Sequence, residues 1–239
     1  MGRSADRELR GSIVRVAEIA TSVRDAMFGL MDEAYVVGRE SFLADLAAKD
    51  WAILLHDQQG GLRGFTSLAV MDADVGDRSI RALFSGDTII QPEFWGSLEL
   101  PRVWGRFMLQ AIEEAGAREL YWFLISSGYK TYRFLPVFFR EFFPRFDCPT
   151  PNDLQAILDS IGEKRFHARF DRERGIIRLE HPTPLRPGIA DLTPERLQDP
   201  HVAFFVDRNP GYDRGEELAC IARLTVDNLR PFIRRALKA

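Results

Sequence analysis

The sequence predicts a mixed α/β fold, α+β in type, in which helices flank a mixed central sheet. Two observations support this prediction. Extended and helical patterns follow one another from Ser12 to Phe146 in the order strand, helix, helix, three strands, helix, strand, helix. In addition, the segment RELYWFLISSG is almost continuously apolar, which is typical of a strand that is buried on both faces of a sheet.

The elements of the first half follow from their periodicity. Alternating apolar residues indicate a strand over residues 12–21, and apolar residues at helical spacing indicate helices over residues 22–35 and 39–50. Extended runs separated by turn residues then predict a hairpin and a strand that carries the chain back, at residues 51–55, 62–70 and 79–91.

The second half begins with a long amphipathic helix over residues 98–115 and the apolar strand over residues 118–128. Helical spacing resumes over residues 129–146, and a boundary follows at residues 148–151. Beyond the boundary the pattern predicts a helix, two strands and a closing helix, at residues 152–166, 175–181, 217–224 and 225–239.

These elements divide the chain into two parts. We expect a core over residues 1–147 and an extension over residues 148–239. The extension is expected to pack on the core and to complete its sheet, because its strands are too few to form a stable sheet by themselves.

Composition narrows the classes of partner. The 35 acidic and 32 basic residues give a formal net charge of −3, which offers no general attraction to nucleic acid or to an anionic membrane. No apolar run approaches the roughly 20 residues that span a bilayer, and the polar N-terminal stretch lacks the apolar segment of a secretory signal. We therefore expect a cytoplasmic protein with a small-molecule partner and no nucleic-acid or membrane partner, and leave a homodimer open.

Neither cysteine nor histidine spacing indicates a metal site. Cys148 and Cys220 lie far apart, and the 4 histidines are scattered without paired spacing. The 18 phenylalanines are open to two interpretations: large rings that fill a core, or an apolar pocket for an acyl chain or an aromatic ligand.

The segment TIIQPEFWGSLELPRVW, residues 88–104, has the pattern of a buried strand that passes through a proline and one glycine into a helix. A strand, a tight loop and a helix N-terminus can hold a phosphate, because the free N–H groups of the first helical turn point at the ligand. Such loops are usually rich in glycine, which lets the backbone approach the phosphate closely. Gly96 is the single glycine of this segment.

The element order of the first 150 residues and this loop together resemble the GCN5-related N-acetyltransferase (GNAT) superfamily. In that superfamily the fourth strand ends in a pattern V-x-P-x-x-R/Q-G-x-G-x-G/A, whose backbone cradles the pyrophosphate of an acyl-CoA. Ile90, Pro92 and Gly96 stand where the apolar residue, the proline and the first glycine of the pattern belong.

Three positions depart from the pattern. Trp95 replaces its basic or amide residue, Leu98 its second glycine, and Leu100 its last small residue. A leucine side chain that pointed inward would exclude a phosphate. The loop therefore binds CoA in an altered way, or it binds something else.

The resemblance implies acetyl-CoA or another acyl-CoA as the cofactor and a small amine as the acceptor. The cofactor-binding positions carry over to the end of the fourth strand, the loop and the end of the fifth strand: Ile89, Ile90, Gln91, Trp95, Gly96, Ser97, Leu98 and Ser126.

Attack of an amine on a thioester needs a base for the amine and an acid for the departing thiolate. Asp87, near the end of the fourth strand, and Glu93, just beyond it, are the candidate bases. By the same resemblance, Tyr132 is the candidate acid. A packing role stays open for Tyr129 and Tyr132, and bonding to local backbone N–H groups stays open for Asp87.

Three functions remain open on the sequence. The first is an N-acyltransferase that moves an acyl group from acyl-CoA to a small amine. The second is a degenerate GNAT fold that acts as a ligand-binding or protein-interaction module without CoA-dependent catalysis, to which the altered loop points. The third takes its acyl group from the phosphopantetheine arm of a carrier protein, which has no adenosine pyrophosphate and needs less of the loop.

Overall fold

The computed structural model describes residues 8–189 and 191–236. Residues 1–7 of the polar N-terminal stretch and residues 237–239 of the expected closing helix lie outside these ranges. The strands are β1 (Arg10–Arg15), β2 (Trp51–His56), β3 (Leu62–Val75), β4 (Arg78–Ile90), β5 (Glu119–Ser126), β6 (Phe170–Asp171), β7 (Ile176–Arg178) and β8 (Glu216–Arg223).

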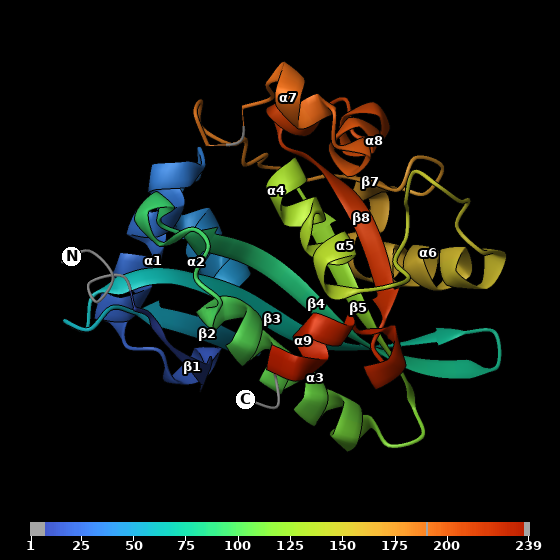
Figure 1. Cartoon of the computed structure of the whole chain (residues 1–239), viewed down its shortest axis with the longest axis horizontal. Helices are drawn as coiled ribbons and strands as arrows, with labels where there is room; N and C mark the ends of the chain where they lie inside the picture. The colour runs from blue at the N-terminus through green and yellow to red at the C-terminus, as the bar shows by residue number, and fades with distance from the viewer. Residues whose placement is uncertain (1–7, 190, 237–239) are drawn as a thin grey trace.

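In the part of the chain that the structure describes, these strands form one sheet in the order β1-β2-β3-β4-β5-β8-β7-β6 (Figure 1). The neighbours β4 and β5 run parallel, whereas the other neighbouring pairs run antiparallel. The mixed α/β fold predicted from the sequence is thus confirmed.

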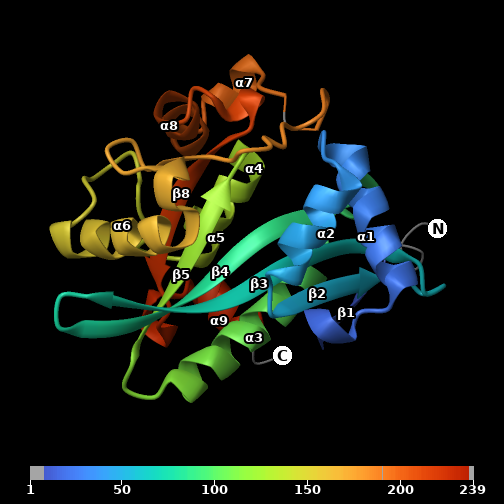
Figure 2. The same cartoon turned by 180° about the vertical axis from the view of Figure 1, so that it is seen from behind.

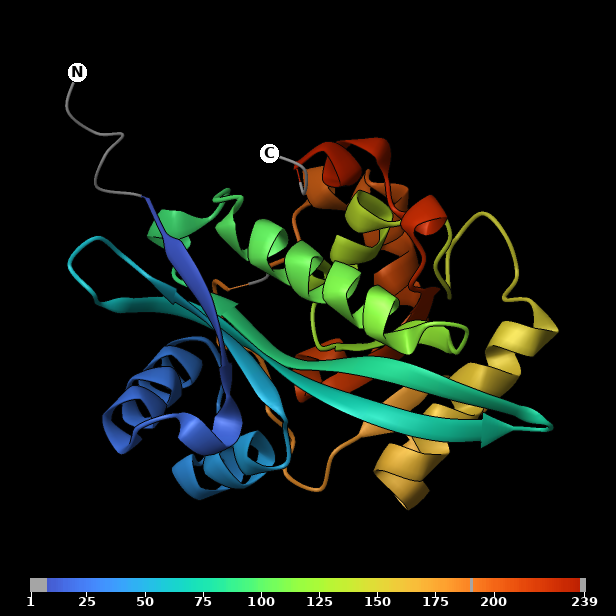
Figure 3. The same ribbon diagram turned by 90° about the horizontal axis from the view of Figure 1, so that it is seen from below.

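Helices cover both faces of this sheet, as Figures 2 and 3 show. The helices α1, α2 and α6 lie on one face, and α3, α4, α5, α8 and α9 lie on the other. The helical segments are α1 (Thr21–Ala34), α2 (Arg39–Ala47), α3 (Glu99–Ala115), α4 (Tyr129–Tyr132), α5 (Phe134–Phe138), α6 (Asn152–Phe166), α7 (Pro194–Leu197), α8 (Pro200–Arg208) and α9 (Pro231–Ala236). No helix among the described residues combines the length and the apolarity that crossing a membrane requires.

The sequence explains why α3 and β5 pack at the centre. In α3, Leu100, Trp104 and Phe107 recur at helical spacing and are buried, and Gly116, at φ 59°, ends the helix in a conformation that glycine adopts readily. The strand β5 is buried on both faces, because α3 packs against one face and α6 against the other. Many of the phenylalanines belong to these buried clusters, so they fill the core.

The region predicted as an extension contributes three strands to the same sheet. The strand β8 pairs with β5 from Arg223 beside Tyr121 to Leu218 beside Ser126, and β7 and β6 follow it. The C-terminal segment therefore lies directly beside the end of β5.

Residues 129–146 differ from the expected helix. The helices α4 and α5 are short and end by Phe138. Beyond them the backbone of Phe143 forms two hydrogen bonds with Ile221 of β8, at 2.8 and 2.7 Å, so this stretch pairs with a strand and does not continue a helix. Apolar residues are so frequent in this stretch that their spacing matches that of a helix, although the stretch is not helical.

Candidate functional site

The parallel strands β4 and β5 separate part-way along their length. They pair from Ile80 beside Glu119 to Ser85 beside Leu124. Beyond these residues β4 stays paired with β3, and β5 stays paired with β8. The sheet therefore opens between β4 and β5 after Ser85 and Leu124, and we call this the opening.

A β-bulge in β4 marks the start of the opening. Gly86 and Asp87 of β4 stand opposite the single residue Ser67 of β3, and such a bulge bends a strand and redirects its side chains. Glycine at position 86 leaves room for two neighbours, because a Cβ there would lie 2.7 Å from both the Lys49 Cε and the Ser67 Oγ and would force them to shift. The bulge therefore lets Lys49 approach β4 closely, next to Asp87.

A groove of about 830 Å³ lies over the connection between β4 and α3. Its walls are the end of β4, the 3₁₀ turn η3 (Pro92–Phe94), the start of α3 and the short helix α4. We call it the loop groove. Glu93 lines it, and so do all the predicted cofactor-binding residues except Ser126: Ile89, Ile90, Gln91, Trp95, Gly96, Ser97 and Leu98.

The loop uses part of its own backbone hydrogen-bonding capacity. The N–H groups of Phe94, Trp95 and Ser97 donate to carbonyls of the same loop, at 2.9, 3.2 and 3.1 Å. Gly96 has a φ of 95°, a conformation that favours glycine. The turn therefore offers a phosphate fewer N–H groups than a fully glycine-rich loop would.

A carboxylate also occupies the start of α3. Glu99, in the first turn, accepts a hydrogen bond of 2.9 Å from the Gly11 N–H. A negative charge there interacts favourably with the helix dipole and repels a second anion. Leu98, just before it, is 58% exposed, so the position of the missing glycine carries an apolar side chain at the rim of the groove.

Trp95 folds back into the loop groove. In the β3–β4 ladder the Gln91 N–H donates to the Arg63 carbonyl at 2.9 Å, so alternation points the backbone groups of Ile90 toward the opening. The Trp95 indole N–H donates to the Ile90 carbonyl at 2.8 Å, and the Lys130 ammonium lies 3.6 Å from the centroid of the indole ring system. Trp95 thus links the two walls of the groove.

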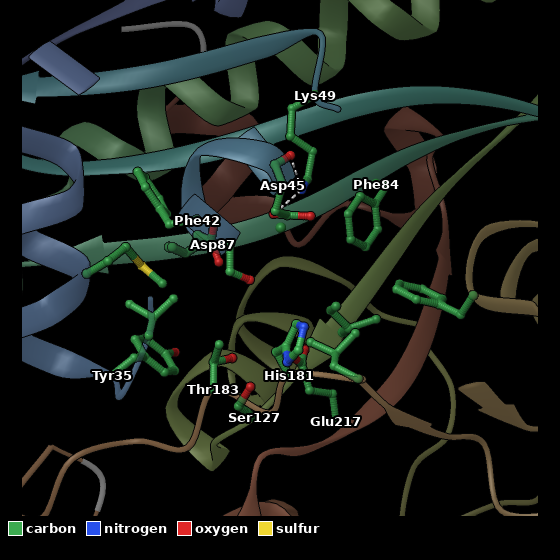
Figure 4. A pocket seen from close by; sticks show the side chains of 18 of the residues that line it. Tyr35, Phe42, Asp45, Lys49, Phe84, Asp87, Ser127, His181, Thr183 and Glu217 are labelled. Atoms are coloured by element: carbon green, nitrogen blue, oxygen red, sulfur yellow. Dashed lines mark hydrogen bonds and ion pairs between the residues drawn. The ribbon is translucent and has the colours of Figure 1, made fainter. Parts of the chain in front are cut away.

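A second cavity, of about 320 Å³, lies on the α1 and α2 face of the opening (Figure 4). We call it the carboxyl pocket. Its ionisable lining residues come from α2, the bulge of β4, α6 and β8, and from the segments that follow α1, α2, α6 and β7: Tyr35, Asp45, Lys49, Asp87, Arg165, Arg169, Glu180, His181 and Glu217.

Two carboxyl groups in this pocket have raised pKa values. Burial raises the pKa of Asp87 to about 6, with a further contribution from Asp45 and an opposing one from Lys49. Burial raises the pKa of Glu217 to about 8, and the neighbouring Asp87 carboxyl adds to the shift. At pH 7 the pocket therefore holds an ionised Asp87 and a largely protonated Glu217.

The buried cation of the pocket is already paired. The Lys49 side chain is 1% exposed and forms an ion pair with the Asp45 carboxylate, and its ammonium also donates to the Asp45 carbonyl at 3.2 Å. Asp45 lies in the last turn of α2 and Lys49 just beyond the helix, so this pair closes the end of α2. Its positive charge is balanced locally.

The two cavities meet at the opening. Tyr35, Thr88 and Thr131 line both the loop groove and the carboxyl pocket. Thr88 also lines a small apolar cavity of about 30 Å³ that reaches between Trp104 and Trp122. A molecule in the groove and another in the pocket would therefore face each other at Thr88, just beyond the bulge.

Two of the predicted site residues lie outside these cavities. Tyr132 is fully buried, and its hydroxyl donates to the Pro144 carbonyl at 2.9 Å, so the geometry gives no support to its expected role as the acid. Tyr129, one turn earlier, lines the loop groove. Ser126 is fully buried, while its neighbour Ser127 lines the carboxyl pocket. The candidate bases are not together either, because Asp87 lines the pocket and Glu93 the groove.

Sequence reasoning missed the groups that share the carboxyl pocket with Asp87. Lys49, Arg165 and Glu217 come from distant parts of the chain, and no short motif links them. One signal was available: Glu217 comes directly before the apolar run LACIA of residues 218–222, and a carboxyl buried beside an apolar strand segment is a candidate functional group. Among residues 8–189 and 191–236, no group of three or more histidine, cysteine or acidic side chains is placed to hold a metal ion.

Comparison with solved structures finds partial matches. A probable N-acyltransferase from Enterococcus faecalis is 13% identical, with a TM-score of 0.42 over 55% of this chain and 33% of its own. A GCN5-related N-acetyltransferase from Kribbella flavida is 12% identical, with a TM-score of 0.42 over 57% of this chain and 34% of its own. The GNAT-family N-acetyltransferase YhbS from Escherichia coli, solved in complex with CoA, is 13% identical, with a TM-score of 0.37 over 52% of this chain and 67% of its own.

These matches concern the fold alone. The chain spans about a third of the length of the Enterococcus and Kribbella proteins. No family model and no curated protein matches the sequence. The order of the elements, the parallel β4–β5 pair and the opening between these strands give the chain the GNAT-like fold that its sequence predicted.

Proposed function

We propose that this GNAT-like chain is an N-acyltransferase that moves an acyl group from an acyl-CoA thioester to a small amine. One observation carries the proposal: two cavities of different character meet at the opening beside the bulge of β4, and Thr88 lines both. The loop groove and the carboxyl pocket, of about 830 and 320 Å³, have volumes typical of small-molecule sites. The groove suits the donor, and the pocket suits the amine.

The donor's thioester would lie at the inner end of the loop groove. There the N–H groups of Thr88 and Ile90 point toward the opening, because the ladder with β3 uses those of the alternate residues. A fixed backbone N–H at this place polarises the thioester carbonyl and stabilises the negative charge that develops on its oxygen.

The amine would enter through the carboxyl pocket as an ammonium ion. Asp87, whose pKa is about 6, is ionised at neutral pH and close to the ideal strength of a general base. It takes one proton from the ammonium, the nitrogen attacks the thioester carbonyl carbon, and the carbon–sulfur bond breaks as the thiolate leaves. The nitrogen loses its second proton as the amide forms, so the two protons end on Asp87 and on the thiol. Tyr129, which lines the groove, is the candidate proton donor to that thiolate in place of Tyr132.

The release of free thiol from acetyl-CoA and from longer acyl-CoAs, measured with a panel of primary amines, tests this proposal. We expect thiol release that depends on the amine, and an acylated amine in the mass spectrum. Asp87→Asn should lower kcat by about 10²- to 10⁴-fold and leave the Kd for CoA unchanged.

Asp74→Asn is the matched control, because Asp74 is an exposed carboxylate on β3 and lines neither cavity. Calorimetry that detects no acyl-CoA binding at millimolar concentration would contradict the proposal. So would amine-dependent thiol release that Asp87→Asn leaves unchanged, since the base would then lie elsewhere.

A second candidate is a ligand-binding module without CoA-dependent catalysis. It is favoured by the loop, where the Trp95 indole occupies the Ile90 carbonyl and the Glu99 carboxylate stands at the start of α3. Native mass spectrometry that finds a co-purified apolar ligand, together with no thiol release, would support it. The same features suit a donor without an adenosine pyrophosphate, so the assay includes acyl-pantetheine beside acyl-CoA.

A further inference from the structure

The carboxyl pocket contains a guanidinium that forms no ion pair with a described residue. Arg165 belongs to the last turn of α6 and lines the pocket. Its Cζ lies 4.3 Å from the centroid of the Phe84 ring, and its Nε is buried without a hydrogen-bond partner among the described residues. An arginine side chain keeps its charge in a protein and carries five donors in a fork that fits an anion.

The other cations of the pocket are occupied. Lys49 is paired with Asp45, and Arg169 is paired with Glu180 at 2.5 Å. The guanidinium of Arg165 is therefore the cation of the pocket that is left for an anionic ligand, and its half-buried position makes such a ligand more stabilising than it would be in water.

The carboxyl groups of Asp87 and Glu217 are the acidic counterpart of Arg165 in the pocket. Neither takes part in an ion pair among the residues that the structure describes. Glu217 is 6% exposed, so its carboxyl faces the pocket and not the solvent. A cation that enters the pocket would find two carboxyl groups and no competing arginine or lysine partner.

The guanidinium of Arg165 and the carboxyl group of Asp87 both lie along the strand β4. Phe84, which supports Arg165, and Asp87 both belong to β4 and both line the pocket. Three residues of extended chain span roughly 10 Å, so one small molecule can reach from the guanidinium to the carboxyl pair.

We propose that the carboxyl pocket binds an acceptor that carries an anionic group as well as its amine. Arg165 receives the anion, the Asp87 carboxylate pairs with the ammonium, and the neutral Glu217 carboxyl accepts a hydrogen bond from it. This inference rests on the proposed function and names its acceptor class, a zwitterion of amino-acid size with a carboxylate or a phosphate. A plain amine leaves the Arg165 guanidinium without an ion-pair partner, and a plain anion leaves the Asp87 carboxylate without one. The volume of about 320 Å³ lies at the small end of ligand sites, which favours a free metabolite over a peptide.

The test measures binding to the whole chain without any acyl donor, by ligand-observed NMR and thermal shift. The probes are ω-amino acids from glycine to 6-aminohexanoate, O-phosphoethanolamine, and alkylamines of matching length. We expect at least one zwitterion to bind at least about tenfold more tightly than its matched alkylamine, because a charge-assisted pair with the guanidinium contributes that much or more. The best chain length reports the spacing between the two charged regions.

Arg165→Gln should lower the affinity for that zwitterion by about tenfold to a hundredfold, down to that of the alkylamine. Arg165→Lys keeps the charge and should retain part of the affinity. Arg174→Gln is the control, because Arg174 is exposed in the turn between β6 and β7 and lies outside the pocket. Urea unfolding of each variant verifies that it is folded.

Equal affinities for zwitterions and matched alkylamines, or a wild-type affinity in Arg165→Gln, would overturn this proposal. Failure of every zwitterion to bind would do the same. The donor-free measurement separates the two proposals. A zwitterion that binds through Arg165 but never accepts an acyl group contradicts the proposed function alone, whereas thiol release with alkylamines and never with zwitterions overturns this one alone.

Discussion

Replacing Glu217 by glutamine should change the stability of the protein in a way that depends on pH. Burial raises the pKa of this carboxyl from 4.5 to about 8 in the folded protein, so between these values the folded state keeps a proton that the unfolded chain releases. Wild-type stability therefore falls as the pH rises through this window. The full loss is on the order of 5 kcal/mol, since a pKa difference of one corresponds to about 1.36 kcal/mol.

Urea unfolding of wild type and Glu217→Gln at pH 5.5 and pH 9 measures this contribution. The amide cannot ionise, so the free energy of unfolding of the variant relative to wild type should increase by about 3 kcal/mol between the two pH values. Glu216→Gln is the matched control, because the neighbouring Glu216 pairs with Arg178 at 2.9 Å and its side chain points to the other face of β8. A variant-to-wild-type difference that stays constant with pH would refute the assignment of a protonated Glu217 at neutral pH.

Two further predictions concern the bulge and the loop. Gly86→Ala should destabilise the protein by about 1–3 kcal/mol in urea unfolding, because the new Cβ would lie 2.7 Å from Lys49 and Ser67 atoms. Gly29→Ala in α1 is the control. Nothing lies within 4 Å of a Cβ at that position, so this variant should be more stable by about 0.5–1 kcal/mol. An unchanged stability in Gly86→Ala would mean that Lys49 and Ser67 can move away from a Cβ at this position without cost. Trp95→Phe frees the Ile90 carbonyl while keeping a ring beside Lys130, so the Kd for acyl-CoA, measured by calorimetry, should fall about twofold to tenfold. Weaker binding would instead mean that the indole itself contacts the donor.

The fold and one side of the site were predictable because their signals are local. The stripe of α3, the apolar run of β5 and the turn residues between β2, β3 and β4 each lie within one short segment of sequence. Pro92 and Gly96 likewise mark the loop groove within a few residues of each other. Periodicity and turn chemistry act over such distances, so a single sequence reveals them.

The carboxyl pocket depends on which strands become neighbours, and a single sequence does not carry that information. Glu217 reaches the pocket because β8 pairs with β5, and Arg165 reaches it because α6 packs under the same strands. The different surroundings of Tyr129 and Tyr132 also lie beyond what the sequence pattern shows. Both lie in α4 and both are buried, but the Tyr132 hydroxyl donates to the Pro144 carbonyl, whereas Tyr129 lines the loop groove.

The placement of β8 beside β5 has a consequence for any attempt to dissect the chain. A fragment that stopped before residue 148 would leave the edge of β5 without the partner that covers it from Tyr121 to Ser126. An uncovered apolar edge promotes self-association, and the same cut would remove Glu217 and Arg165. The segment beyond residue 148 therefore both covers the edge of β5 and supplies two residues of the carboxyl pocket, so a minimal version of the chain must include it.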